Sequence, residues 1–241
     1  MKKYFKTSIL CVLTGLFLVS CASTPKVPFD AANVSPAAII SITANDEITW
    51  YGESTEKKTG LLNMAINKAV KENADDTSLA YLGFTKNLLD DSAAAANEVL
   101  TSNGFTLVED AGSSYKTASD DKVLKLAGFV SPNGYKMLNL NNSVAASVKA
   151  ETRTNYFVYI TYNIEKTIVT GVAKNGTMTA CVTTTIQVAD ANGKRIALAH
   201  GYASGKDKIA SVGGVYDAKA LYAMYPAVIR DSLNDACKKL K

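Results

Sequence analysis

Apolar and polar residues alternate along most of residues 154–203. A period of two is typical of strands that bury one face. Asn175-Gly176 and the segment Asp190-Ala191-Asn192-Gly193 divide the region into three stretches, and both are sequences typical of hairpin turns. The pattern therefore predicts a three-stranded antiparallel meander. Its first two strands place on one face Tyr156, Val158, Ile160, Tyr162 and Ile164, and then Met178, Ala180, Val182, Thr184, Ile186 and Val188.

Other stretches have the spacing of a helix face, with apolar residues three or four positions apart. They predict helices over 60–73, 91–103, 119–128, 142–150 and 217–241. In the second helix, Asp91 or Ser92 is suited to the N-cap and Asn103-Gly104 to a left-handed C-terminal stop. Pro226 falls inside the last helix and is expected to kink it or to start a second one.

Short apolar runs over 37–42, 47–52 and 105–109 predict further strands towards the N-terminus. Strands and helices together predict an α+β fold in a single domain. Its mostly antiparallel sheet combines the C-terminal meander with the N-terminal strands, and helices pack on one face of that sheet.

The first 20 residues have the pattern of a bacterial signal peptide. Lys2, Lys3 and Lys6 precede an 11-residue apolar stretch, Ile9–Val19. That stretch is shorter than the ~20 residues of a membrane-spanning helix. An ordinary secretory signal and an uncleaved anchor are the alternative interpretations.

The tetrapeptide Leu18-Val19-Ser20-Cys21 resembles the lipobox of bacterial lipoproteins. The resemblance implies that the thiol of Cys21 receives a diacylglyceryl group, and that cleavage before Cys21 exposes an amine that receives an N-acyl chain such as palmitate. Two or more buried chains are what stable anchoring requires. No other cofactor is expected.

The sequence predicts three segments: a signal peptide over 1–20, a lipidated N-terminus with a flexible tether over 21–36, and a globular periplasmic domain over 37–241. The tether is rich in small residues and contains Pro25 and Pro28. By analogy with enteric bacteria, Ala22 rather than Asp after the lipidated cysteine favours the outer membrane, with the domain on the periplasmic face or at the cell surface.

The formal net charge of +4 owes three lysines to the signal peptide, which carries no acidic residue. The remaining chain has 23 basic and 22 acidic residues, so no nucleic-acid partner is expected. Cys181 and Cys237 are the cysteines left after Cys11 is removed and Cys21 is acylated. They form a disulfide or stay as two buried thiols.

The sequence gives little support for an enzymatic function. His200 is the one histidine, so no metal-ligand cluster of recognised spacing exists, and there is no glycine-rich phosphate loop. Ser113-Ser114-Tyr115-Lys116 and Lys58-Thr59-Gly60 are similar to two motifs of penicillin-binding enzymes, but they occur in the wrong order. We expect no metal and no enzymatic activity.

The order of elements resembles a group of outer-membrane lipoproteins, namely the curli-secretion-channel type (CsgG) and the activators of peptidoglycan synthases (LpoB). The resemblance is carried by a helix that ends in Asn-Gly before Phe-Thr-Leu-Val-Glu-Asp, by the segment 155–160, and by the segment 186–194 with its Asp-Ala-Asn-Gly-Lys turn. It implies a non-enzymatic periplasmic domain that contacts another protein or assembles with itself.

The leading hypothesis is a membrane-anchored lipoprotein that binds a cell-envelope protein. Aromatic residues are enriched at binding hot spots, so Trp50, Tyr51 and Tyr216 are the predicted contact residues. Partly buried core positions are the alternative for Trp50 and Tyr216. A carrier of a small apolar or lipid ligand, which requires an enclosed apolar cavity, and an oligomeric secretion component are the other functions considered.

Overall fold

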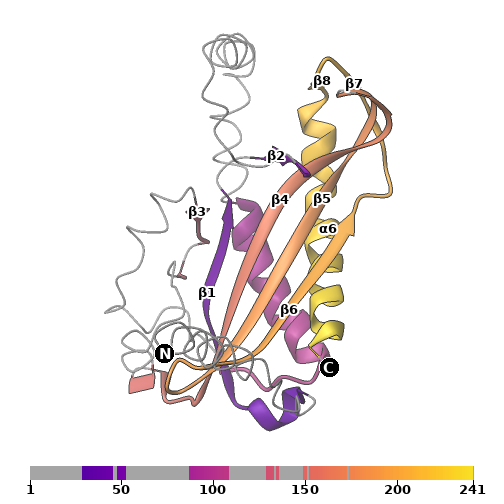
Figure 1. Cartoon of the computed structure of the whole chain (residues 1–241). Helices are drawn as coiled ribbons and strands as arrows, with labels where there is room; N and C mark the ends of the chain where they lie inside the picture. Colours follow the sequence, from indigo (N-terminus) through magenta and orange to yellow (C-terminus); the bar gives the residue numbers. More distant parts are fainter. Residues whose placement is uncertain are drawn as a thin grey trace, which may run out of the picture.

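The computed structural model describes residues 29–45, 48–52, 87–108, 129–132, 134–135, 149–150, 152–172 and 174–240 (Figure 1). The Cys21 site, the predicted helices over 60–73 and 119–128, and nearly all of the one over 142–150 lie outside these residues. The described part is an α+β domain with one mostly antiparallel sheet, as predicted.

The described sheet has eight strands in the order β3-β1-β4-β5-β7-β8, while β2 pairs with β4 and β6 pairs with β5. The bounds of the strands are β1 Ala37–Asn45, β2 Thr49–Trp50, β3 Phe129–Val130, β4 Tyr156–Val172, β5 Asn175–Asp190, β6 Arg195–Ser204, β7 Ile209–Val212 and β8 Val215–Tyr216. The meander β4-β5-β6 confirms the strongest prediction from the sequence. Two parallel pairings, of β1 and of β2 with β4, were not predicted.

The hairpin β4–β5 is the longest feature of the sheet and runs from the pair Tyr156↔Asp190 to the pair Val172↔Asn175. Different strands pair with the hairpin at its two ends. Near its base β4 is bordered by β1 and β5 by β6, whereas near its turn the neighbours are the short strands β2 and β7. Figure 1 shows β7 and β8 beside the turn, at the end of the molecule opposite the C-terminus.

Side chains at alternate positions of the strands join one hydrophobic cluster with α6 (Ala218–Lys239) and with the helix over 87–102. From β4 the cluster includes Val158, Ile160, Tyr162 and Ile164. We call the side of the sheet that bears these residues the core face, and the opposite side the outer face. The strand residues that fill this cluster follow the predicted period of two.

Helix α6 is one helix despite Pro226, where the sequence allowed for a second helix. Asp217 caps its start by accepting a hydrogen bond from the Ala220 amide at 3.0 Å. Proline removes one backbone hydrogen bond. Buried residues on both sides of Pro226, from Leu221 to Cys237, keep the helix on the sheet.

The helix over 87–102 starts earlier than the sequence predicted, so the predicted N-cap is wrong. The Ser92 hydroxyl instead donates to the Leu88 carbonyl oxygen at 2.6 Å inside the helix. The predicted stop is confirmed by Gly104, which has a φ of +96°. Leu107 beyond it forms only an isolated parallel bridge to Ala37, where the sequence predicted a longer strand.

Residues 29–36, which the sequence assigned to the flexible tether, pack against the domain. The short 3-10 helix η2, Ala31–Val34, lies in the segment predicted to be a flexible tether. The Phe29 and Phe105 rings are 6.0 Å apart, and the Ser35 hydroxyl accepts a hydrogen bond from the Thr106 amide. The segment free to act as a tether therefore ends before Phe29.

Candidate interaction surface

Two of the three predicted contact residues, Trp50 and Tyr216, lie together on the core face near the turn of the β4–β5 hairpin. Their rings meet edge to face with centroids 6.5 Å apart, and both side chains are half-buried. Strands β2 and β8, which carry them, have only two residues each. The aromatic pair therefore helps to fix two short strands to the sheet.

Lys166 of β4 completes this cluster. Its Nζ lies 5.2 Å from the Trp50 ring centroid and 5.0 Å from that of Tyr216, within the range of cation–π attraction. The same Nζ donates to the Ile48 carbonyl oxygen at 3.1 Å and to the Tyr216 hydroxyl at 3.0 Å. A nearly buried ammonium is tolerated here because these partners satisfy it.

Burial of this cluster also changes its acid–base chemistry. Burial, followed by the neighbouring Tyr222, raises the pKa of Tyr216 to about 12, so its phenol is neutral at physiological pH. Partial burial, the ring contact between them and their contacts with Lys166 mark Trp50 and Tyr216 as structural supports. The alternative interpretation from the sequence, that they are partly buried core, describes them better than an exposed hot spot.

The third predicted residue, Tyr51, lies apart from this cluster. It is 52% exposed, and its ring contacts that of Tyr202 on β6, with centroids 5.4 Å apart. Tyr202 pairs with Thr183, whose side chain points away from the core face that the neighbouring Val182 occupies. Tyr51 therefore joins the outer face, and the structure separates it from the neighbouring Trp50.

The Tyr51–Tyr202 pair lies over Cys181 of β5, which is fully buried. Burial, together with the charge of Glu165, raises the pKa of the Cys181 thiol to about 12, although a hydrogen bond with Tyr202 opposes the rise. Reactive cysteines require a lowered pKa. The thiol is therefore a poor nucleophile.

The outer face stays open along β6, although Phe157, Tyr159 and Ala189 on the same face are buried. Leu198 and Tyr202 of β6 are each 40% exposed and lie on the outer face, as their pairing with Gln187 and Thr183 requires. With Tyr51 they form what we call the outer patch: Tyr51, Leu198 and Tyr202. Sequence reasoning found only Tyr51, although alternation along β6 held the signal for the other two.

Side chains of α6 protect the free edge of β6. The Tyr202 amide donates to the Asp235 carboxylate at 2.9 Å, and Lys239 donates to the His200 carbonyl oxygen at 3.1 Å. Hydrogen bonds from Lys239 and from the Tyr202 amide lower the pKa of Asp235. Unpaired edges invite the addition of another strand. The middle of β6 is thus blocked against such pairing, which leaves its side chains as the accessible feature.

The possible disulfide between Cys181 and Cys237 is not formed, and both are free, buried thiols. Cys237 belongs to the hydrophobic cluster on the core face, while Cys181 points from β5 towards Tyr202 on the outer face. The sheet separates the two sulfur atoms.

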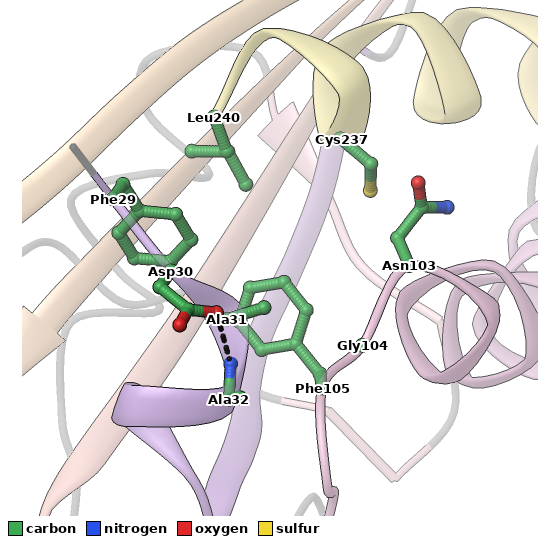
Figure 2. Close-up of a pocket in the computed structure, with 9 residues that line it drawn as sticks. All are labelled: Phe29, Asp30, Ala31, Ala32, Asn103, Gly104, Phe105, Cys237 and Leu240. Carbon is green, nitrogen blue, oxygen red and sulfur yellow. Dashed lines mark hydrogen bonds between the residues drawn. The ribbon is translucent and has the colours of Figure 1, made fainter.

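A cavity of about 280 Å³ opens at the base of the domain, where η2, the turn after the helix over 87–102 and the end of α6 meet (Figure 2). Ligand pockets are commonly ~300–1,000 Å³. The Asp30 carboxylate is already used to accept from the Ala32 amide at 3.0 Å. This cavity is small and lies at one end of the domain, rather than between helices and sheet as the carrier hypothesis requires. Its lining consists of Phe29, Asp30, Ala31, Ala32, Asn103, Gly104, Phe105, Cys237 and Leu240.

Within the described residues, no group of three or more His, Cys, Asp or Glu side chains is placed to hold a metal ion. His200 is exposed on β6, and its Nδ1 lies 2.9 Å from the Thr185 hydroxyl. The segments 58–60 and 113–116, with their similarity to penicillin-binding enzymes, fall outside the described residues. No helix among the described residues is long and apolar enough to span a membrane.

No protein-family model, curated protein or solved structure matches the chain.

Proposed function

We propose that this chain is a lipid-anchored lipoprotein of the bacterial envelope, at the outer membrane, that binds another envelope protein without catalysing a reaction. The observation that carries the proposal is the outer patch, an exposed aromatic pair and an exposed leucine four residues away on the same strand of a well-supported sheet. Tyrosine is enriched at binding hot spots because its ring buries a large area at a small cost in conformational entropy.

The rigidity of the support strengthens this proposal. Tyr202 lies on β6, which pairs with β5 over nine registered positions, and α6 fixes its free edge. A preorganised surface loses little entropy on binding. The partner is expected to contact side chains of the outer patch rather than to extend the sheet.

The anchor supplies the location. Seven residues separate Cys21 from Phe29, the first residue that the structure describes. At ~3.4 Å per residue the connection reaches at most about 27 Å. An anchored domain is thereby confined near its membrane, and its partner is expected there rather than across the peptidoglycan.

Site-specific photo-crosslinking in cells tests the proposal. A photoreactive amino acid replaces Tyr202 or Leu198 in the full chain, and Asn192, exposed in the turn before β6, serves as the control position. We expect a discrete adduct with one envelope protein from positions 202 and 198, reduced by Tyr51→Asp, and none from position 192. Equal labelling at all three positions, or no adduct at any of them, would overturn the assignment.

A further inference from the structure

The two tyrosines of the outer patch meet above a carboxylate. One row of paired residues crosses four strands: Thr49 of β2, Glu165 of β4, Cys181 of β5 and Ser204 of β6. Tyr51 and Tyr202 each lie two residues from an end of this row, on opposite sides of it. Since β2 and β6 are three strand spacings apart, ~14 Å, rings with centroids 5.4 Å apart must reach across the outer face of β4 and β5. They therefore meet over Glu165 and Cys181.

The side chain of Glu165 lies on the outer face. Its neighbours in β4 point the other way, since Ile164 belongs to the hydrophobic cluster and the Lys166 Nζ lies over the Trp50 ring. After burial, the charge of Glu165 is the next cause of the raised pKa of the Cys181 thiol, so carboxylate and thiol are close on one side of the sheet. Glu165 is only partly covered, and its carboxylate is accessible beside the tyrosines.

No cation accompanies this carboxylate among the described residues. The Glu165 side chain makes no hydrogen bond or ion pair there, and burial raises its pKa. Lys166, adjacent in sequence, donates its hydrogen bonds on the core face. Glu98, by contrast, forms an ion pair with Arg230 at 2.8 Å. The charge of Glu165 is therefore not compensated within the described part of the domain.

Binding at the outer patch makes this charge important. A protein that covers Tyr51 and Tyr202 also removes water from Glu165. An isolated charge is strongly unfavourable in a desolvated site, and an opposite charge with good geometry offsets that penalty. Aromatic ring faces attract cations as well, and the planes of these two rings are inclined at 51°. The carboxylate and the rings together favour a partner that brings a positive charge.

We propose that Glu165, Tyr51 and Tyr202 form a cation site that binds the guanidinium group of an arginine of the partner protein. This inference rests on the proposed function and adds the chemistry of the partner. Arginine fits better than lysine, because its planar group stacks on an aromatic ring and donates two parallel hydrogen bonds to a carboxylate. Arginine is also enriched among the residues that dominate protein interfaces.

Titration with small probes tests the cation site without the partner. The full chain in a maltoside detergent is titrated with N-acetyl-arginine amide or with its neutral isostere, N-acetyl-citrulline amide, while nuclear magnetic resonance follows the rings of Tyr51 and Tyr202. We expect the arginine probe to bind about fivefold more tightly, since exposed cation–π contacts and ion pairs are each modest. Glu165→Gln should remove that difference, and Asp231→Asn, at an exposed acid of α6, should retain it. Equal binding of the two probes to the unaltered chain would overturn the inference.

A second variant keeps this titration decisive if Glu165→Gln does not fold. Tyr51→Leu removes one ring from an exposed position and should reduce the preference for the arginine probe while the carboxylate remains. An unchanged preference would contradict the part assigned to the rings. Thermal unfolding shows whether each variant is folded.

Photo-crosslinking in cells separates this inference from the proposed function. With the photoreactive amino acid at position 198, Glu165→Gln should lower the adduct yield about tenfold, because the arginine of the partner loses its charged partner. Asp231→Asn should leave the yield unchanged. A yield that stays the same or rises with Glu165→Gln would overturn the inference alone, since the adduct itself supports the proposed function. Selective binding of the arginine probe without any adduct would overturn the proposed function and leave the cation site.

Discussion

The two halves of the β4–β5 hairpin are held by different kinds of interaction. Near its base, Val158 and Ile160 of β4 pack in the hydrophobic cluster, with β1 and β6 along the sides. Near its turn, two-residue strands, the Lys166 cluster and hydrogen bonds between turns hold the structure. The base is stabilised by buried apolar area, while the end relies on a few directional contacts that leave Val172, Val212 and Val215 exposed.

The largest effect is expected in the base. Gly201 of β6 lies against α6 so closely that an added Cβ would meet the Ser232 carbonyl oxygen at 2.0 Å and the Ala236 amide nitrogen at 2.3 Å. Gly201→Ala should lower the free energy of unfolding by about 3 kcal/mol, since backbone must move. Urea unfolding measures this, with His200→Ala as the exposed neighbouring control. A loss no larger than that of the control would show that α6 does not rest on this strand.

Next in size is the loss of the Lys166 ammonium. Lys166→Met keeps the length of the side chain but leaves the Ile48 carbonyl and the Tyr216 hydroxyl without their donor, which costs about 1–3 kcal/mol. Since the contacts are local, amide hydrogen exchange should accelerate in β2 and β8 and stay slow in β5. Uniform acceleration along the hairpin would contradict the division into two halves.

Two buried tyrosines differ in whether the hydroxyl group has a hydrogen-bond partner. Among the described residues, the buried Tyr162 hydroxyl has no hydrogen-bond partner, whereas the Tyr225 hydroxyl donates to the Glu165 carbonyl oxygen at 2.9 Å. Burial raises the pKa of Tyr162 accordingly. We expect Tyr225→Phe to destabilise by about 1 kcal/mol and Tyr162→Phe to be neutral or stabilising. If thermal unfolding shows that both variants lose the same stability, the Tyr162 hydroxyl has a hydrogen-bond partner.

Alkaline pH should weaken both halves. Cys181 and Tyr216 have pKa values raised from 9.0 and 10.0 to about 12, so the folded state favours their neutral forms. The part of the free energy of unfolding that depends on these neutral groups is fully present below about pH 9, and it is lost as pH rises towards 12. The free energy of unfolding, measured from pH 7 to 11, should fall at the upper end, and Tyr216→Phe should make that fall shallower. A flat profile would contradict burial of these groups.

The smallest effect on stability is expected at Val212 and Val215, which flank the turn between β7 and β8. Val212→Ser with Val215→Ser removes side chains that are more than 70% exposed, so the free energy of unfolding should change by less than about 0.5 kcal/mol. Chemical denaturation is the measurement. A substantial loss of stability would mean that these valines are packed rather than exposed.

Local signals in the sequence predicted local structure well. Alternation from Tyr156 to Val188, with its Asn175-Gly176 turn, gave the meander because a period of two with a hairpin turn has one simple solution. Long-range pairing was missed. Nothing local indicates that β1 pairs in parallel with β4, since that register depends on how distant segments pack.

The same distinction explains the outcome for the candidate site. Aromatic character singled out Trp50 and Tyr51, but the sequence could not show which distant residues each of them would contact. Leu198 and Tyr202 were overlooked because exposure of an edge strand depends on what covers it. Gly213-Gly214 between two valines indicated a turn, yet only the pairing of β7 with β5 brings that turn beside the turn of the β4–β5 hairpin.

The proposed function requires that the domain be held at a membrane through Cys21. Intact-mass and peptide mass spectrometry of the protein extracted from membranes test this most directly. We predict a mature chain that begins at Cys21 and carries a diacylglyceryl group and an N-acyl chain, and a Cys21→Ser chain that lacks both. A mature N-terminus at another residue, or an unmodified Cys21, would contradict the account.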